Sequence, residues 1–226
     1  MYFVGREKEI GQIRESLEEG RNVIISGKYG MGRTSLVQHI ADTMKGQWRF
    51  VFVDFSKTPG SVCNHLLAEL FPMHAFDREH LKYKPSRFRI ATLAIQDNRK
   101  HAIVLDNISK LSAQKINLIR YLTWENRFQF VSIVESFLVK EGLFRLRVWM
   151  NPSTFISLHR LSELSVAQFF RQLSKEQHLG WPEKQIKNLA EVTGGYPLRM
   201  KEIALREVER KRQLQEMGVE HLIGVH

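Results

Sequence analysis

The segment from residue 22 to residue 41 constrains the fold of this chain more than any other. Residues 22–26 form an apolar run, and residues 36–41 repeat apolar side chains at helical spacing. Between them lies a glycine-rich loop with the residues Gly27, Lys28, Tyr29, Gly30, Met31, Gly32, Arg33, Thr34 and Ser35. The order of strand, glycine-rich loop and helix is the setting of a P-loop.

The loop matches the pattern G-x-x-x-x-G-K-[ST] at its two glycines, Gly27 and Gly32, and at Thr34, the magnesium-ligand position. Such a loop turns backbone N–H groups toward phosphate oxygens, and the following helix adds its positive end. The sequence therefore predicts that residues 27–35 bind a nucleotide. The alternative is a glycine-rich turn that only joins a strand to a helix.

One position departs from the pattern, because Arg33 stands where the P-loop has lysine. Arginine keeps the positive charge, but its guanidinium is a planar fork whereas the lysine ammonium is a compact point charge. We therefore list Arg33 among the catalytic candidates and leave hydrolysis open.

A second diagnostic stretch is residues 101–107, in which four apolar residues are followed by Asp106. An apolar strand that ends in an acid, downstream of a P-loop, is the Walker B pattern, and it predicts that Asp106 reaches the magnesium ion held by Thr34. Asp106 could instead cap the next helix. Asn107 follows directly, and its amide can orient a water molecule but cannot accept the proton of that water.

The remaining pattern predicts an α/β fold with a parallel sheet flanked by helices over residues 1–158, followed by a small all-helical lid over residues 159–226. Residues 49–55, 128–136 and 154–158 are further apolar runs, as expected for parallel strands that are covered on both faces. The fourth strand ends in Glu135 and Ser136, which we expect near the γ-phosphate. A short helix over residues 137–144 is expected next, before Arg145 and Arg147.

The charge of the chain favours a polyanionic partner. The sequence has 34 Lys and Arg against 24 Asp and Glu, a formal charge of +10 and a pI near 9.8, which suits nucleic acid because phosphate neutralisation releases counterions. The alternative is a basic surface without such a partner. The candidate nucleic-acid contacts are four basic residues that alternate with the aromatic residues Tyr83 and Phe88. They are Lys82, Lys84, Arg87 and Arg89. A solvated connection is the other interpretation of that segment.

The single cysteine, Cys63, excludes an internal disulfide and fits a reducing cytoplasm. No apolar run is long enough to predict a membrane span, and the first residues do not have the pattern of a signal peptide. We therefore expect a cytoplasmic protein without a membrane partner.

Five features in one order resemble the AAA+ superclass, particularly its origin-recognition-like and STAND-type ATPases. They are the opening F-V-G-R-E at residues 3–7, the P-loop, the strand that ends in Asp106, S-L-H-R-L-S at residues 157–162 and G-G-Y-P-L at residues 194–198. The resemblance covers residues 3 to about 205. It implies the AAA+ fold, ATP or ADP with Mg²⁺ as the ligand, and an assembly with a protein partner or with further copies.

The resemblance also implies roles for individual residues. Val4, Gly5 and Arg6 would line the adenine side, and Tyr196 and Pro197 would lie against the base or ribose. Glu135 or Ser136 would be the sensor at the end of the fourth strand. Arg145 and Arg147 match the region that supplies an arginine finger to a neighbouring subunit, or they form a surface pair. Where the lid of this family has a sensor arginine, this chain has Leu198, with Arg199 one residue later.

Three functions fit these observations. The first is a weak ATPase that acts as a nucleotide-dependent helper on DNA, where ATP stabilises an assembly. The second is a signalling switch of the STAND type. The third is a nucleotide-binding partner subunit without catalysis, in which the degenerate motifs support a fold and an interface.

Overall fold

The computed structural model describes residues 3–72, 82–93, 95 and 97–216. The chain forms two compact units. The α/β unit contains residues 7–29 and 33–158, and the helical unit contains residues 1–6, 30–32 and 159–226. Each unit is described by itself below.

The α/β unit is built on a parallel sheet of five strands in the order β2-β3-β4-β1-β5. The strands are β1 (Asn22–Gly27), β2 (Trp48–Asp54), β3 (Lys100–Ile108), β4 (Gln129–Glu135) and β5 (Ser153–Ser157). Because parallel neighbours require crossover connections, a helix follows each of the first four strands. All five strands therefore end at the same edge of the sheet, the edge at which open α/β sheets bind ligands.

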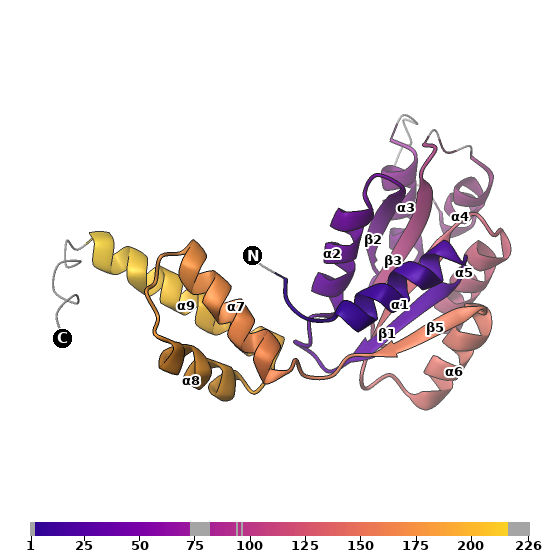
Figure 1. Ribbon diagram of the computed structural model, residues 1–226. Coiled ribbons are helices and arrows are strands. Elements are labelled where there is room, and N and C mark those ends of the chain that lie inside the picture. The colour runs from indigo at the N-terminus through magenta and orange to yellow at the C-terminus, as the bar shows by residue number, and fades with distance from the viewer. Residues whose placement is uncertain (1–2, 73–81, 94, 96, 217–226) are drawn as a thin grey trace. The chain divides into compact units, whose positions relative to one another are not determined.

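Helices cover both faces of this sheet (Figure 1). On one face, α1 (Glu7–Glu18) packs on β1 and β5, and α2 (Arg33–Met44) packs on β1 and β2. On the other face, α3 (Pro59–Leu70), α4 (Tyr83–Thr92), α5 (Ala113–Trp124) and α6 (Lys140–Trp149) share one apolar core with the strands. Double coverage explains why the strand sequences are almost continuously apolar.

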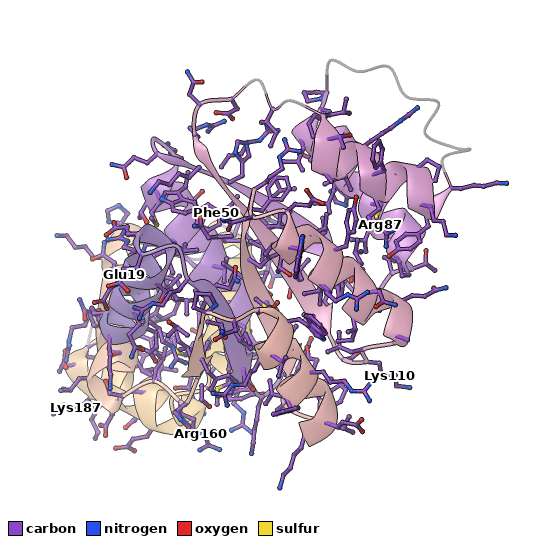
Figure 2. All side chains as sticks on the ribbon, turned by 90° about the vertical axis from the view of Figure 1, so that its right-hand side faces the viewer. Glu19, Phe50, Arg87, Lys110, Arg160 and Lys187 are labelled. Atoms are coloured by element: carbon purple, nitrogen blue, oxygen red, sulfur yellow. The ribbon has the colours of Figure 1, made fainter. Side chains whose placement is uncertain are left out.

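Two side chains on the second face, Arg87 and Cys63, are held by their packing. Arg87, labelled in Figure 2, lies over the rings of Tyr83 and Tyr121, with 5.4 and 4.1 Å between its guanidinium carbon and the ring centroids. Cys63 is fully buried, and this burial raises the pKa of its thiol to about 12. The thiol is therefore protonated and protected in the folded protein.

The helical unit consists of α7 (Glu163–Glu176), α8 (Glu183–Thr193) and the long helix α9 (Pro197–Glu216). The Ser162 hydroxyl caps α7 by accepting a hydrogen bond from the Ser165 amide. Gly194 ends α8 in the left-handed conformation at φ 55°, as glycine does at many helix C-termini. The core of the unit includes Val4 together with Phe170 and Ile186.

The structure confirms the parallel sheet flanked by helices and the helical C-terminal part that the sequence predicts, but it corrects one helix. The expected helix over residues 137–144 instead runs from Lys140 to Trp149, so that Arg145 and Arg147 lie within it. The reason is that Leu146 and Met150 extend the apolar spacing of Leu143 by one turn, and both are fully buried. Of the helices that the structure describes, none is long and apolar enough to cross a membrane.

Candidate nucleotide-binding site

The glycine-rich loop connects the end of β1 at Gly27 to the start of α2 at Arg33. Gly30 and Gly32 adopt φ values of 79° and 78°, in the left-handed region where a side chain is strained. These two glycines allow the loop to turn sharply before the helix begins. The positive end of α2 and the loop amides are the elements from which a phosphate site is built.

The predicted magnesium ligands are in contact within the α/β unit. The Thr34 hydroxyl, in the first turn of α2, donates to Asp106 Oδ2 over 2.9 Å, and Asp106 Oδ1 accepts from the Asn107 amide over 2.8 Å. Hydroxyl and carboxylate oxygens are the ligand type of Mg²⁺, which usually takes one or two protein groups and completes its shell with phosphates and water. Thr34 and Asp106 therefore suit that ion. Among the described residues, no group of three or more His, Cys, Asp or Glu side chains could hold a metal ion.

Arg33 is engaged by the protein itself. Its guanidinium donates from Nη2 to Glu135 Oε1 over 2.7 Å and from Nη1 to the Val134 carbonyl over 2.5 Å. The side chains are 7% (Arg33) and 14% (Glu135) exposed, so this ion pair is largely shielded from water. The sheet order explains the contact, because β4 lies beside β1 and Glu135 is in register with Gly27.

Asn107 connects the ends of two neighbouring strands. It adopts a φ of 60°, and its side-chain amide donates to Asp54 Oδ1 over 3.3 Å. Asp54 ends β2 and is in register with Asp106 on β3. Hydrogen bonds from the side chain and backbone of Ser56 and from Asn107, with the charge of Lys57, lower the pKa of Asp54 below its ordinary value despite partial burial, so the carboxylate is ionised at neutral pH.

Sequence reasoning did not select Asp54, although a signal was present. Residues 49–55 are an apolar run with one acid near the end, the same pattern that drew attention to Asp106. The order of residues along the sequence does not show that β2 and β3 are neighbouring strands. Only the pairing of these strands brings Asp54 and Asp106 together.

The other loop residues differ in exposure. Lys28, Tyr29 and Ser35 are exposed, whereas Met31 is buried. The exposed side chains of Lys28 and Tyr29 suit a loop that presents its backbone to a ligand. Their contacts with nucleotide stay predictions.

The predicted adenine-side residues all belong to the helical unit. The Arg6 guanidinium donates to the carbonyls of His159 (2.5 Å) and Met31 (3.4 Å), and the Arg6 side chain is buried. The Val4 side chain lies in the core of this unit. Both side chains therefore have structural contacts of their own, and their role toward adenine stays a prediction.

The G-G-Y-P segment packs against the other members of the same unit. The Leu161 amide donates to the Gly195 carbonyl over 2.8 Å, and the Leu198 amide donates to the Gly30 carbonyl over 3.1 Å. A side chain at Gly30 would lie 2.9 Å from the Leu198 Cβ and 3.0 Å from the Tyr196 hydroxyl, so only glycine fits there. The expected contact of Tyr196 and Pro197 with base or ribose stays a prediction.

The two arginine-finger candidates lie on α6. Arg145 pairs with Glu141 one turn earlier over 2.6 Å, and both side chains are exposed. Arg147 lies over the Phe155 ring of β5, with 5.7 Å between its guanidinium carbon and the ring centroid. Neither contact shows an action on a second subunit.

The basic segment divides into two groups. Of residues 73–88, the structure describes those from Lys82 onward. Arg87 packs over the rings of Tyr83 and Tyr121, whereas Lys82, Lys84 and Phe88 are exposed and Arg89 is half-buried. A nucleic-acid interface would therefore use the exposed group, and it stays a prediction.

Solved structures with the same fold include proteins from Aeropyrum pernix and Pyrobaculum aerophilum. The Aeropyrum pernix ORC1 protein, solved in complex with DNA, matches with a TM-score of 0.63 at 15% identity over 94% of this chain and 62% of its own. Cdc6p from Pyrobaculum aerophilum matches with a TM-score of 0.65 at 13% identity, over 93% of this chain and 64% of its own. The likeness at this identity concerns the fold.

A STAND protein from Pyrococcus horikoshii, PH0952, with a tetratricopeptide repeat sensor, matches with a TM-score of 0.54 at 19% identity, over 92% of this chain and 32% of its own. The present chain therefore spans less than two thirds of each of these three proteins. Comparison with curated protein sequences found no match. The family of AAA ATPase domains matches residues 2–134, more than half of the 226 residues, and the chain belongs to that family.

Proposed function

We propose that this protein binds ATP or ADP with Mg²⁺ through its α/β unit. The observation that carries the proposal is the contact between the Thr34 hydroxyl and Asp106 Oδ2, directly after the glycine-rich loop. Two segments that lie 72 residues apart in the sequence place magnesium-type oxygens together, at the edge of the sheet where ligands of this fold class bind.

The chain's own groups divide the work of binding. Backbone amides of residues 27–34 surround the phosphates, and the N-terminus of α2 adds its positive end. Thr34 and Asp106 would hold Mg²⁺, and the ion would supply positive charge that neutralises the phosphates. Asp54, Asn107 and Glu135 lie at the ends of β2, β3 and β4, close to this region.

Hydrolysis is slow in this proposal. Glu135 neutralises Arg33 within the protein, which weakens the electrostatic help that the loop cation gives to a phosphate. Asn107 cannot accept a proton. An arginine supplied by a neighbouring subunit can raise phosphoryl-transfer rates by about 10³–10⁵ where it operates, and Arg145 and Arg147 are the candidates.

The biological role that we propose is a nucleotide-dependent helper on DNA, in which ATP stabilises an assembly in the cytoplasm. The formal charge of +10 and the exposed residues Lys82 and Lys84 support a polyanionic partner. The ORC1 structure was solved in complex with DNA, which is consistent with this role but concerns that protein.

A second candidate is a nucleotide-binding partner subunit without catalysis. The buried ion pair between Arg33 and Glu135 favours it, because a P-loop cation that the protein neutralises is of less use for phosphoryl transfer. The two functions share the binding site and differ in turnover.

A titration with ATP, with and without Mg²⁺, tests the proposed site. Thr34→Ala and Asp106→Ala should each remove the magnesium-dependent part of the affinity and leave the metal-free part nearly unchanged. Thr43→Ala and Asp42→Ala are matched controls, since both residues are exposed in the last turn of the same helix. Wild-type affinity in both site variants with Mg²⁺ present would show that the site is wrongly assigned.

A further inference from the structure

Asp54 has no role in the site as the P-loop pattern defines it, but it lies beside a magnesium ligand. Asp54 and Asp106 are register partners on neighbouring parallel strands. Register partners point to the same side of a sheet, and neighbouring strands are roughly 4.8 Å apart. The Asp54 carboxylate is therefore close to the place where Thr34 and Asp106 would hold Mg²⁺ and the phosphates.

Two residues bond this carboxylate, and a third holds the backbone that follows it. Asp54 Oδ1 accepts from the Ser56 amide over 3.0 Å and from the Asn107 side chain over 3.3 Å. Lys115 braces the segment after β2, because its ammonium donates to the carbonyls of Phe55 (2.6 Å) and Ser56 (3.2 Å). A half-buried carboxylate held in this way loses little rotamer freedom when it binds a further ligand.

The carboxylate also has the capacity to accept a hydrogen bond from a water molecule. An ionised carboxylate can accept about four hydrogen bonds, and its partners here are the amide and hydroxyl of Ser56 and the side chain of Asn107. Counting the partners among the described residues, one acceptor position stays available to a donor from the ligand side.

The position after Asp106 links these observations to chemistry. Asn107 cannot take a proton, but its side chain donates to Asp54, the register partner of Asp106 on β2. Its φ of 60° turns the backbone so that its amide bonds Asp106 while its side chain bonds Asp54. Asn107 is thus placed to hold a carboxylate that stands on the neighbouring strand.

We propose that Asp54 orients the water that attacks the γ-phosphate and accepts its proton, and that Asn107 is the residue that positions Asp54. This inference rests on the proposed ATP site. The water oxygen forms a bond to the γ-phosphorus, the bond from that phosphorus to the β–γ bridging oxygen breaks, and its electron pair leaves with ADP. The proton passes from the water to the Asp54 carboxylate and then to solvent.

The test separates turnover from binding in the full-length chain. Asp54→Asn keeps the shape of the side chain and should lower kcat by about 10²–10⁴, the usual contribution of a general base. The affinity for ATP with Mg²⁺ should stay within about twofold, because the substitution leaves the phosphate and metal groups in place. Asp42→Asn, an exposed acid on α2, is the matched control and should retain wild-type turnover.

Asn107→Ala tests the positioning role. It should lower kcat with little change in KM, and Asn107→Gln, which can still donate to Asp54, should restore part of the loss. The double variant Asp54→Asn/Asn107→Ala should be no slower than Asp54→Asn alone, since the two residues act as one unit. Thermal unfolding of each variant shows that it is folded, and Asp54→Ser serves as a second variant if Asp54→Asn does not fold.

Each outcome decides the question. Wild-type turnover in Asp54→Asn, a joint loss of binding and turnover, or losses that add in the double variant would each overturn the role of Asp54. A wild-type chain that binds ATP without hydrolysing it would overturn that role and leave the binding site intact. A wild-type chain that does not bind ATP would overturn the proposed function itself.

Discussion

The substitution Glu135→Gln should lower the stability of the protein and raise its affinity for ATP. Arg33 and Glu135 form a largely buried ion pair, and Arg33 stands at the lysine position of the P-loop. Glutamine removes the negative charge and keeps an oxygen that can accept the bond from Arg33 Nη2. One residue therefore controls two quantities with opposite signs.

The size of both effects follows from this contact. A hydrogen bond to a charged group contributes about 1.5–3 kcal/mol, and loss of one partner of a fully buried pair costs about 3–5 kcal/mol. Because the introduced glutamine would still accept a bond and Arg33 also donates to the Val134 carbonyl, we expect a loss of about 2 kcal/mol in the free energy of unfolding. Without the negative charge of Glu135, phosphate is no longer repelled and Arg33 is no longer neutralised. ATP affinity should therefore rise by roughly ten- to a hundredfold, at about 1.4 kcal/mol per tenfold.

Urea unfolding without nucleotide measures the first effect, and fluorescence titration with an ATP analogue measures the second. Glu141→Gln is the matched control, because Glu141 forms an exposed pair with Arg145 and should change the unfolding free energy by less than about 1 kcal/mol. Weaker nucleotide binding by Glu135→Gln would refute the reasoning, and so would an unfolding free energy equal to that of the wild type.

Three further predictions concern turnover, DNA and pH. The wild-type chain should hydrolyse ATP more slowly than about 1 s⁻¹, which is the lower end of common turnover numbers. Arg33→Lys should raise the rate that a phosphate-release assay measures. A faster wild-type chain or a slower variant would contradict this prediction. DNA affinity measured by fluorescence anisotropy should fall as the salt concentration rises. The double variant Lys82→Ala/Lys84→Ala should reduce the slope of log affinity against log salt concentration by about 0.9 per lost phosphate contact, whereas alanine at the exposed positions Lys184 and Lys187 on α8 should leave that slope unchanged. An unchanged slope in the Lys82→Ala/Lys84→Ala variant would show that α4 is not part of the interface. Burial is the largest cause that lowers the pKa of His101 in the folded protein. His101 therefore binds a proton more readily in the unfolded protein than in the folded one, and the free energy of unfolding should fall as the pH drops below about 6.5. His101→Gln should reduce that fall in urea titrations at pH 7 and 5.5, whereas His65→Gln, at an exposed position, should leave it as in the wild type.

The sequence is sufficient for the fold class because local patterns carry it. Apolar runs covered on both faces predict parallel strands, and the glycine-rich loop marks the first of them. The helix before β5 is longer than the sequence predicts, because the expected helix ends at Phe144 whereas the buried residues Leu146 and Met150 continue the apolar pattern. That error moves Arg145 and Arg147 out of a helix to which they belong.

The site can be predicted only where the motif itself specifies a partner. The sequence selects Thr34 and Asp106 together because P-loop and Walker B chemistry pairs them, and the structure brings them into contact. The ion pair of Arg33 with Glu135 and the link from Asn107 to Asp54 depend on which strands are neighbours. Strand order is a long-range property, and neither composition nor spacing along the chain determines it.

The division of the chain into units has a consequence for how such a protein can be inherited. Residues 30–32 lie within the connection from β1 to α2 but belong to the helical unit, as do the described residues 3–6. A cut after residue 158 would break the hydrogen bond from the Leu198 amide to the Gly30 carbonyl. It would also separate Val4 from the core that contains Phe170. Recombination at that point would leave both products incomplete, so a gene rearrangement that preserves this protein has to move both units together as one cassette.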